Sequence, residues 1–287
     1  MSTHLATGRT ERSAAEVPVL MYHSIAADAT REFRRFVVDP GEFAAQMDYL
    51  EAEGYRSVTA MDLAASRTGR ALPPRPVVLT FDDAYTDFYS TALPVLREHD
   101  FRATLYVPTA YVGGTASFLR SMGEGNRPVL SWQALRDIAA EGIETAAHSH
   151  THPQLDRVPT AVISDEVRRS RCLLEDHLGV AVEGFAYPFG YWNRAARAAV
   201  AAAGFRYAVA VAELMTGPDD DALTLPRLTV NAGIGVPGLA RLLGTRPTPG
   251  SRRMAAAKRV IWRAMRGMAP AERRDPREGR PARDGGR

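Results

Sequence analysis

The chain has 287 residues, of which 45% are hydrophobic and 24% are charged, the composition of a folded globular protein. It contains one cysteine, which excludes a disulfide framework and a metal site built from several cysteines. The formal net charge of +3 is uneven: residues 246–287 are strongly basic and the remainder is mildly acidic, so the remainder has no overall charge suited to nucleic acid.

The predicted elements alternate between strands and helices along most of the chain. In chain order they are a strand at 17–25, a helix at 40–53, a strand at 76–81, a helix at 86–99, a strand at 103–107, a helix at 131–141, a strand at 143–147, a helix at 159–178, a strand at 184–187, a helix at 193–203, and strands at 207–211 and 228–230. The run PVVLTF at 76–81 has the continuous apolar pattern of a strand buried on both faces.

This alternation indicates parallel strands joined by helical crossovers. We expect a closed or nearly closed β/α barrel first, and an open doubly wound sheet as the alternative. The expected catalytic domain covers residues 17–245. Residues 110–130 form a long glycine-rich insertion within it, and loops of this length in compact domains are often functional.

Both ends of the chain differ from this domain. Residues 1–16 are polar and lack the apolar core of a secretory signal, so we expect a flexible N-terminus and a cytoplasmic location. Residues 246–287 are expected to form a basic tail that is partly helical and partly disordered. This tail could hold the protein at the inner face of an anionic membrane, or it could be a solvated extension.

The side chains that carry chemistry follow predicted strands. Asp82 and Asp83 come directly after the strand at 76–81, where two adjacent carboxylates are costly unless a cation lies nearby. His148 and His152 follow the strand at 143–147, and one helical turn between them would bring the two imidazoles together. Taken singly, the Asp pair could be a helix cap and the His pair surface loop residues.

Three more groups lie at strand ends or mouths. They are His23 at the first strand, the turn from Tyr187 to Gly190, and Arg227 just before the last strand. In parallel β/α folds, the carboxyl ends of the strands are where catalytic groups collect. One Asp and two His would leave a metal position for water, as in catalytic metal sites, and the second Asp could act as a base.

Together these motifs resemble the polysaccharide deacetylase family, carbohydrate esterase family 4, over about residues 17–244. The segment from Thr80 to Asp83 matches the Thr-Phe-Asp-Asp block of that family. The histidine motif matches at His148, Ser149 and His152, and an Ala-Tyr-Pro-x-Gly turn matches from Ala186 to Gly190. The resemblance implies a distorted (β/α) barrel with fewer than eight parallel strands. It also implies a metal-dependent hydrolase that removes N-acetyl groups from amino sugars of a polysaccharide or glycan precursor and releases acetate.

The resemblance also implies roles for individual residues. Asp82 would be the catalytic base. Asp83, His148 and His152 would hold a divalent metal, zinc in the first place, with cobalt, nickel or iron as alternatives. The turn at Phe189 would supply a backbone N–H to the oxyanion. Ser149 would support the site through a hydrogen bond. The residues expected to bind substrate are Tyr187, Pro188 and Trp192.

The chain departs from the family pattern at three positions. Ala186 stands where many members have an arginine that orients the catalytic aspartate, and we predict that Arg227 takes over this role. The segment at 239–245 lacks the histidine that acts as acid in many members. The branch that acts on exopolysaccharides has an N-terminal Met-Tyr-His segment, which matches residues 21–23, so His23 is the predicted acid. Ala84 replaces the commoner glycine, with no expected chemical cost.

Two other functions stay open at this point. One is a deacylase of a small or lipid-linked N-acetylated sugar, and the other is a glycan-binding module without catalysis. The partner expected from the sequence is an N-acetylated glycan rather than nucleic acid, and the sequence makes no prediction of the sugar or the oligomeric state.

Overall fold

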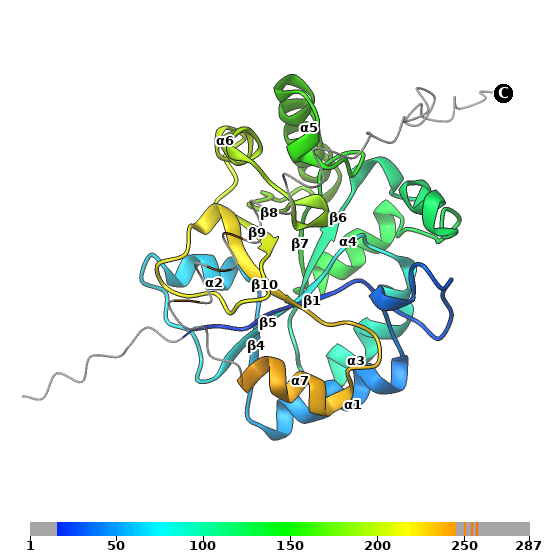
Figure 1. The fold of residues 1–287 in the computed structure, drawn as a ribbon, viewed down its shortest axis with the longest axis vertical. Coiled ribbons are helices and arrows are strands. Elements are labelled where there is room, and N and C mark those ends of the chain that lie inside the picture. Colours follow the sequence, from blue (N-terminus) through cyan, green and yellow to red (C-terminus); the bar gives the residue numbers. More distant parts are fainter. Residues whose placement is uncertain (1–15, 245–249, 251–253, 255–256, 258–287) are drawn as a thin grey trace, which may run out of the picture.

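Seven parallel strands form a closed barrel in the computed structural model, which describes residues 16–244 together with 250, 254 and 257 (Figure 1). Around the ring the strands are β1 (Val19–Tyr22), β10 (Leu225–Thr229), β9 (Tyr207–Val211), β8 (Gly184–Ala186), β7 (Glu144–Ala147), β6 (Thr104–Val107) and β5 (Pro76–Phe81). The ring closes between β1 and β5, where Leu20 pairs with Leu79. The prediction of a parallel barrel with fewer than eight strands is therefore confirmed, and the open sheet is excluded.

Two shorter pieces of sheet lie outside this ring. The strand β4 (Arg56–Val58) pairs with the first half of β5, on the side where β6 pairs with its second half. The strands β2 (Ser24–Ile25) and β3 (Val37–Val38) pair with each other beyond the end of β1. The position of β4 follows from the short pairing of β5 with β6, which distorts the barrel and leaves the start of β5 open to β4.

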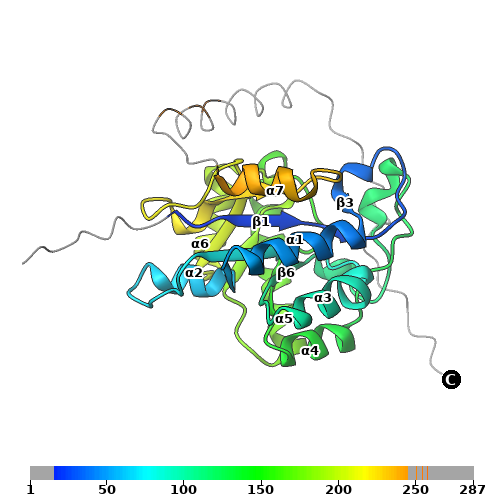
Figure 2. The ribbon, with the colours of Figure 1, turned by 90° about the horizontal axis from the view of Figure 1, so that it is seen from below.

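Helices cover the outside of the barrel (Figures 1 and 2). They are α1 (Pro40–Ala52), α2 (Ala60–Ser66), α3 (Leu93–Glu98), α4 (Trp132–Ala140), α5 (Thr160–Leu178), α6 (Arg194–Ala202) and α7 (Gly235–Gly244). The last helix lies beside α1, so the C-terminal end of the domain closes against its first helix (Figure 2).

The local signals in the sequence explain where several helices begin. Asp39 caps α1 and accepts a hydrogen bond from the backbone N–H of Gly41 at 2.8 Å. Ser131 caps α4, and Asn193 caps α6. The predicted helix at 86–99 is divided, because residues 88–92 form a wider π-helical turn before α3 begins.

Two buried layers hold the domain together. Side chains between the barrel and its helices form the larger layer, which includes Leu79, Phe81 and Leu105. Side chains inside the barrel, among them Val19, Tyr106 and Val209, form the smaller one. Because β-strand side chains alternate between these layers, each strand directs a defined set of residues into the barrel.

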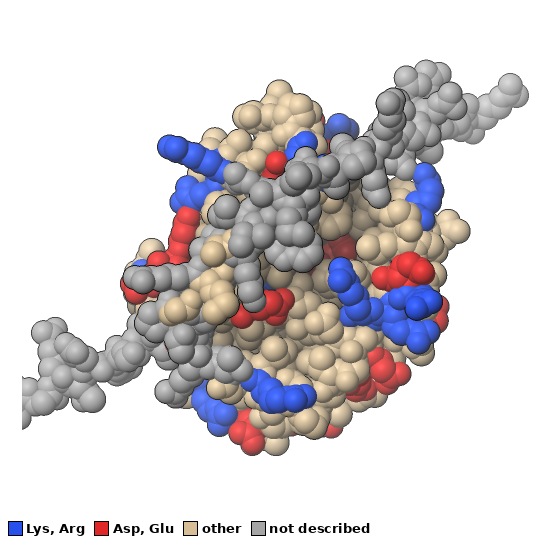
Figure 3. All heavy atoms as spheres, viewed as in Figure 1, with Lys and Arg blue, Asp and Glu red and all other residues tan. Residues whose placement is uncertain are grey.

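The two predicted terminal segments, 1–16 and 246–287, lie almost entirely outside the described residues, so the proposed membrane contact of the tail does too. No helix in the described part of the chain has the length and apolar character needed to cross a membrane, and the cytoplasmic location stays a prediction. On the uncovered part of the face in Figure 3, basic and acidic side chains are interspersed rather than gathered by sign.

Candidate metal and catalytic site

The candidate site lies at the carboxyl ends of the barrel strands. Asp82 and Asp83 directly follow β5, and His148 directly follows β7, so two strands on either side of β6 supply the reactive side chains. They lie at the bottom of a pocket of about 410 Å³. A pocket of this size at this end of a parallel barrel is the usual place for substrate chemistry.

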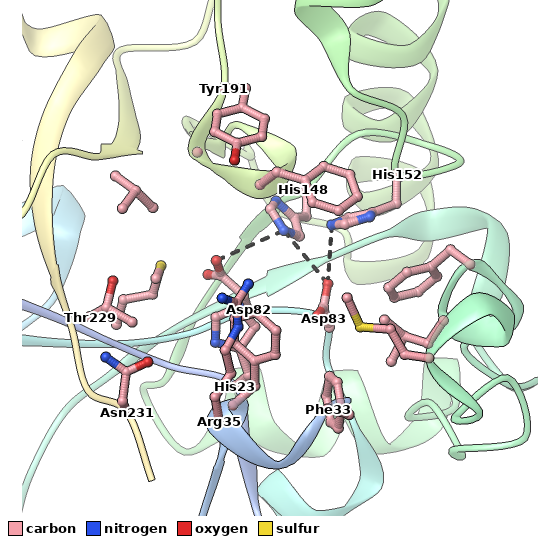
Figure 4. Close-up of a pocket in the computed structure, with 18 of the residues that line it drawn as sticks. His23, Phe33, Arg35, Asp82, Asp83, His148, His152, Tyr191, Thr229 and Asn231 are labelled. Carbon is pink, nitrogen blue, oxygen red and sulfur yellow. Dashed lines mark ion pairs between the residues drawn. The ribbon is translucent and has the colours of Figure 1, made fainter. Parts of the chain in front are cut away.

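Three side chains converge in this pocket (Figure 4). Asp83, His148 and His152 are all buried, and each offers a ligand atom within 4.8 Å of the other two. The Oδ1 atom of Asp83 lies 3.6 Å from Nε2 of His148 and 3.4 Å from Nε2 of His152. These residues come from two separate segments of chain, and they are the three predicted as metal ligands.

The hydrogen bonds of this group fit a bound cation. Nδ1 of His148 donates to the carbonyl oxygen of Ala186 at 2.8 Å, which leaves the Nε2 lone pair directed into the site. Oδ2 of Asp83 accepts from the Tyr85 hydroxyl at 2.7 Å. Oδ1 of Asp83 is buried and has no hydrogen-bond partner in the described part of the chain. A divalent metal would satisfy that oxygen, and neutral imidazoles are among its preferred ligands.

The backbone around these side chains is strained. Five residues other than glycine at the site have positive φ angles, namely Asp83, Ala84, Ser149, His152 and Phe189. Such conformations cost about 1–3 kcal/mol each and persist where the surroundings enforce them. The expectation that Ala84 carries no cost is therefore wrong in one respect: with φ of 52° its backbone adopts a conformation that suits glycine better.

Hydrogen bonds hold the histidine segment in this shape. The Ser149 hydroxyl oxygen accepts from the backbone N–H of His152 at 3.0 Å, which matches the supporting role expected for Ser149. Glu166 on α5 accepts from the backbone N–H groups of His150 and Thr151 at 2.9 and 2.6 Å. The sequence analysis missed Glu166, because a single carboxylate in the middle of a helix gives no sign of what it faces.

Asp82 is paired with Arg227 inside the barrel. The two guanidinium nitrogens Nη1 and Nη2 donate to Oδ1 and Oδ2 of Asp82, each at 2.7 Å. Arg227 is 0% exposed and Asp82 is 3% exposed. Burial, the largest single influence, would raise the pKa of Asp82, but the charge and hydrogen bonds of Arg227, together with the nearby His148 and His23, outweigh it and hold this pKa below its ordinary value. Asp82 is therefore ionised at neutral pH.

Asp83 titrates in the opposite direction. Burial, together with the negative charge of Asp82, raises the pKa of Asp83 to about 7. Two adjacent carboxylates thus have different environments, one neutralised by an arginine and the other facing two histidines. A cation bound at Asp83 would favour its ionised form.

His23 lines the same pocket, with its ring centroid 4.8 Å from that of Phe36. Burial lowers the pKa of His23 to about 4; the charge of Asp82 opposes this shift and that of Arg227 adds to it. His23 is therefore neutral at neutral pH in the free site. A role as acid requires that it gains a proton in the substrate complex.

The turn after β8 contributes different residues from those expected. The pocket is lined by Phe189, Gly190 and Tyr191. Tyr187 and Pro188 are instead buried in the wall, where the Tyr187 hydroxyl donates to the carbonyl oxygen of Leu223 at 3.0 Å. Trp192 packs against Tyr187, with ring centroids 6.3 Å apart. Tyr187, Pro188 and Trp192 are therefore not among the residues that line the pocket, and their role in substrate binding stays a prediction.

The long insertion forms part of the pocket, as its length suggested. Phe118 lies with its ring centroid 4.4 Å from that of His152, and Leu119 and Met122 also line the pocket. Arg127 joins the insertion to the N-terminal segment, since its Nη1 donates to the Ser24 hydroxyl at 3.0 Å and lies 3.4 Å from Asp87. The insertion and the N-terminal segment thus form two walls of the pocket that are joined through Arg127.

Comparisons with known proteins show which sequences and structures resemble this chain. Residues 69–208 match the family described as polysaccharide deacetylase. The chain is 27% identical over 221 residues to the Bacillus subtilis protein YxkH, covering 77% of this chain and 73% of that protein. It is 24% identical over 211 residues to the poly-beta-1,6-N-acetyl-D-glucosamine N-deacetylase of Staphylococcus epidermidis, covering 70% of this chain and 71% of that protein. The structure of the Streptococcus pyogenes deacetylase PplD in complex with acetate is similar with a TM-score of 0.69 and 25% identity, covering 80% of this chain and 98% of that chain.

Proposed function

Because the chain carries a polysaccharide deacetylase domain, we propose that it hydrolyses the N-acetyl groups of amino sugars in a glycan and releases acetate. One observation carries this proposal. Asp83, His148 and His152 converge in one pocket beside Asp82, a carboxylate that Arg227 keeps ionised. This combination provides a cation site and a base within reach of the same substrate atom.

Asp83, His148 and His152 would hold a divalent cation, and we propose zinc, with cobalt, nickel or iron as alternatives. When bound, such a cation polarises the acetamide carbonyl and lowers the pKa of water toward about 7. His148 is suited to bind a cation through Nε2 because it is neutral. Burial lowers its pKa, and its Nδ1 proton is donated to the carbonyl oxygen of Ala186.

Asp82 would accept a proton from the attacking water. Its position supports this role: Oδ2 of Asp82 lies 3.9 Å from Nε2 of His148, so the base borders the cation site. Arg227 would position Asp82, since its bidentate contact fixes the carboxylate plane. The backbone N–H of Phe189 would stabilise the oxyanion.

His23 would protonate the leaving amine. Because its pKa is lowered in the free protein, His23 must receive a proton after substrate binds, and neighbouring Asp82 is the group that favours its charged form. Replacing His23 by Ala should lower kcat for an unactivated acetamide by about 10²–10⁴-fold, the usual effect of an acid–base group. Unchanged turnover of that substrate would show that another group is the acid.

The deciding experiment measures acetate released from N-acetylglucosamine oligomers by the zinc-loaded protein. The Asp82→Asn variant should keep its metal and lose about 10²–10⁴-fold in rate. Asp48→Asn is a matched control, because Asp48 is 73% exposed on α1. Full activity of Asp82→Asn would remove Asp82 from the mechanism.

The same assay separates the alternatives. A deacylase of small or lipid-linked sugars would release acetate from those substrates and not from oligomers. A glycan-binding module would bind oligomers and release no acetate from any substrate, even with metal bound. The nearly complete burial of the three ligand atoms favours an enzyme, because a surface for sugar binding alone does not require a buried, unpaired carboxylate oxygen.

A further inference from the structure

Arg35 is a cationic side chain in the pocket that the proposed mechanism does not use. It lies in the short helical turn Arg34–Phe36 and lines the pocket that holds Asp82 and Asp83. Figure 4 shows Arg35 beside His23, below Asp82. Arg35 is exposed, so its charge stands at the open side of the pocket, where a ligand of the opposite charge would meet it.

The position of Arg35 is fixed by contacts on two sides. Its guanidinium carbon lies 4.4 Å from the centre of the Phe36 ring, and Phe36 in turn contacts His23. Its backbone carbonyl accepts a hydrogen bond from the N–H of Ala232 at 3.0 Å, which joins this segment to the chain after β10. The backbone of Arg35 is therefore held in place, and its exposed side chain rests on Phe36 at the edge of the pocket.

The carboxylates of the pocket have other partners. Asp82 is paired with Arg227, and Asp83 faces the two histidines. Glu213 accepts hydrogen bonds from the backbone N–H and the hydroxyl of Thr229, at 3.1 and 2.5 Å. Within residues 16–244, no carboxylate forms an ion pair with Arg35. Its N–H donors are thus available to a ligand.

We propose that Arg35 binds a negatively charged oxygen group of the substrate. The preferred substrate would then be an N-acetylated amino sugar that carries a carboxylate or a phosphate close to its acetamido group. This inference rests on the proposed deacetylase function and narrows its substrate class. The planar guanidinium matches the two oxygens of such a group and can bind both.

Binding can be tested separately from turnover. The full chain is titrated at fixed ionic strength with N-acetylglucosamine, N-acetylglucosamine 1-phosphate and N-acetylmuramic acid, and dissociation constants are measured by ligand-observed NMR. We expect at least one anionic sugar to bind about 10–100-fold more tightly than the neutral sugar, the effect of a hydrogen-bonded charge. The two anionic sugars distinguish phosphate from carboxylate.

Three variants locate the effect. Arg35→Gln should remove the preference for the anionic sugar and leave binding of the neutral sugar unchanged. Arg35→Lys should restore part of it, because the charge remains but the planar fork is lost. Arg34→Gln is the matched control: Arg34 is the adjacent exposed arginine, it does not line this pocket, and its loss should leave the preference intact.

Turnover provides the second measurement. In the metal-loaded protein, KM for acetate release should be lower for the anionic sugar, and Arg35→Gln should raise that KM alone. Equal binding of all three sugars, or a preference that survives Arg35→Gln, would overturn the role of Arg35. If Arg35-dependent binding is found and no sugar releases acetate, the inference stands and the proposed deacetylase function fails.

Discussion

Replacing Arg227 by Met should produce the largest single effect on stability that the site allows. The guanidinium is wholly buried and makes two hydrogen bonds of 2.7 Å to Asp82. Met keeps an unbranched apolar stem and has no charge, so the variant leaves a buried carboxylate without its partner. Breaking a buried pair in this way costs about 3–5 kcal/mol. That is a large part of the roughly 5–15 kcal/mol by which domains are stable.

The loss of stability in Arg227→Met should depend on pH, because the variant changes the pKa of Asp82. In the parent protein the pKa of Asp82 is lowered, so its ionisation contributes stability above its unfolded pKa of about 3.9, and this contribution is lost as pH falls through the folded pKa. Without Arg227, burial raises the pKa of Asp82 above its ordinary value. The free energy of unfolding of the variant should then be lowest at neutral pH. It should rise again as the pH falls and Asp82 gains a proton.

Urea unfolding with a chelator present, at pH 7.5 and pH 5, measures both effects without a contribution from metal. The double variant Asp82→Asn/Arg227→Met should be more stable than Arg227→Met alone, because it has no buried charge at this position. The coupling energy between the two sites should reach about 2–3 kcal/mol. Additive costs, or an equal penalty for Arg227→Met at both pH values, would refute the assignment of a buried, ionised pair.

Two further predictions concern the strained histidine and aspartate segments. Glu166→Gln should weaken zinc binding by about 10–100-fold, because the amide loses the negative charge that strengthens the two hydrogen bonds to Oε2, and its NH2 group cannot accept from the Thr151 hydroxyl. A competitive chelator titration measures this, with Glu175→Gln on the same helix as control; parent-like affinity would exclude a role for Glu166. Ala84→Gly should change the free energy of unfolding by less than about 0.5 kcal/mol, since relief of the positive φ offsets the lost methyl group, whereas Ala198→Gly in α6 should cost about 1 kcal/mol. Equal losses would show that Ala84 is not strained.

The sequence was most informative where polarity interrupts an apolar pattern. Asp82 and Asp83 stand directly after the continuous run at 76–81, and the structure places them at the end of β5 as expected. Their histidine partners after β7 follow the same rule, because parallel strands bring their carboxyl ends to one edge. The alternation of strands and helices predicted a parallel barrel with an open sheet as the alternative, and the family resemblance favoured the barrel.

The sequence was less informative where the role of a residue depends on the direction in which its side chain points, because neighbouring residues of one turn can face opposite ways. Tyr187 and Tyr191 lie four residues apart in one turn, but only Tyr191 faces the pocket, because the chain reverses at Phe189 and Gly190. The start of β10 was also missed, since Pro226 and Arg227 do not resemble strand residues. Arg227 is tolerated there because Asp82 neutralises it inside the barrel, a contact between residues 145 positions apart.

The link between Arg127, Ser24 and Asp87 has a consequence for how this domain could be altered. The insertion and the N-terminal segment are two walls of one pocket, and they share this buried contact. Transplanting the insertion alone from another barrel would leave Asp87 without its cation and would remove one of the contacts that hold the segment between His23 and Arg35. The two loops form a single exchangeable module, and a redesign of specificity must replace them together while the seven strands stay as they are.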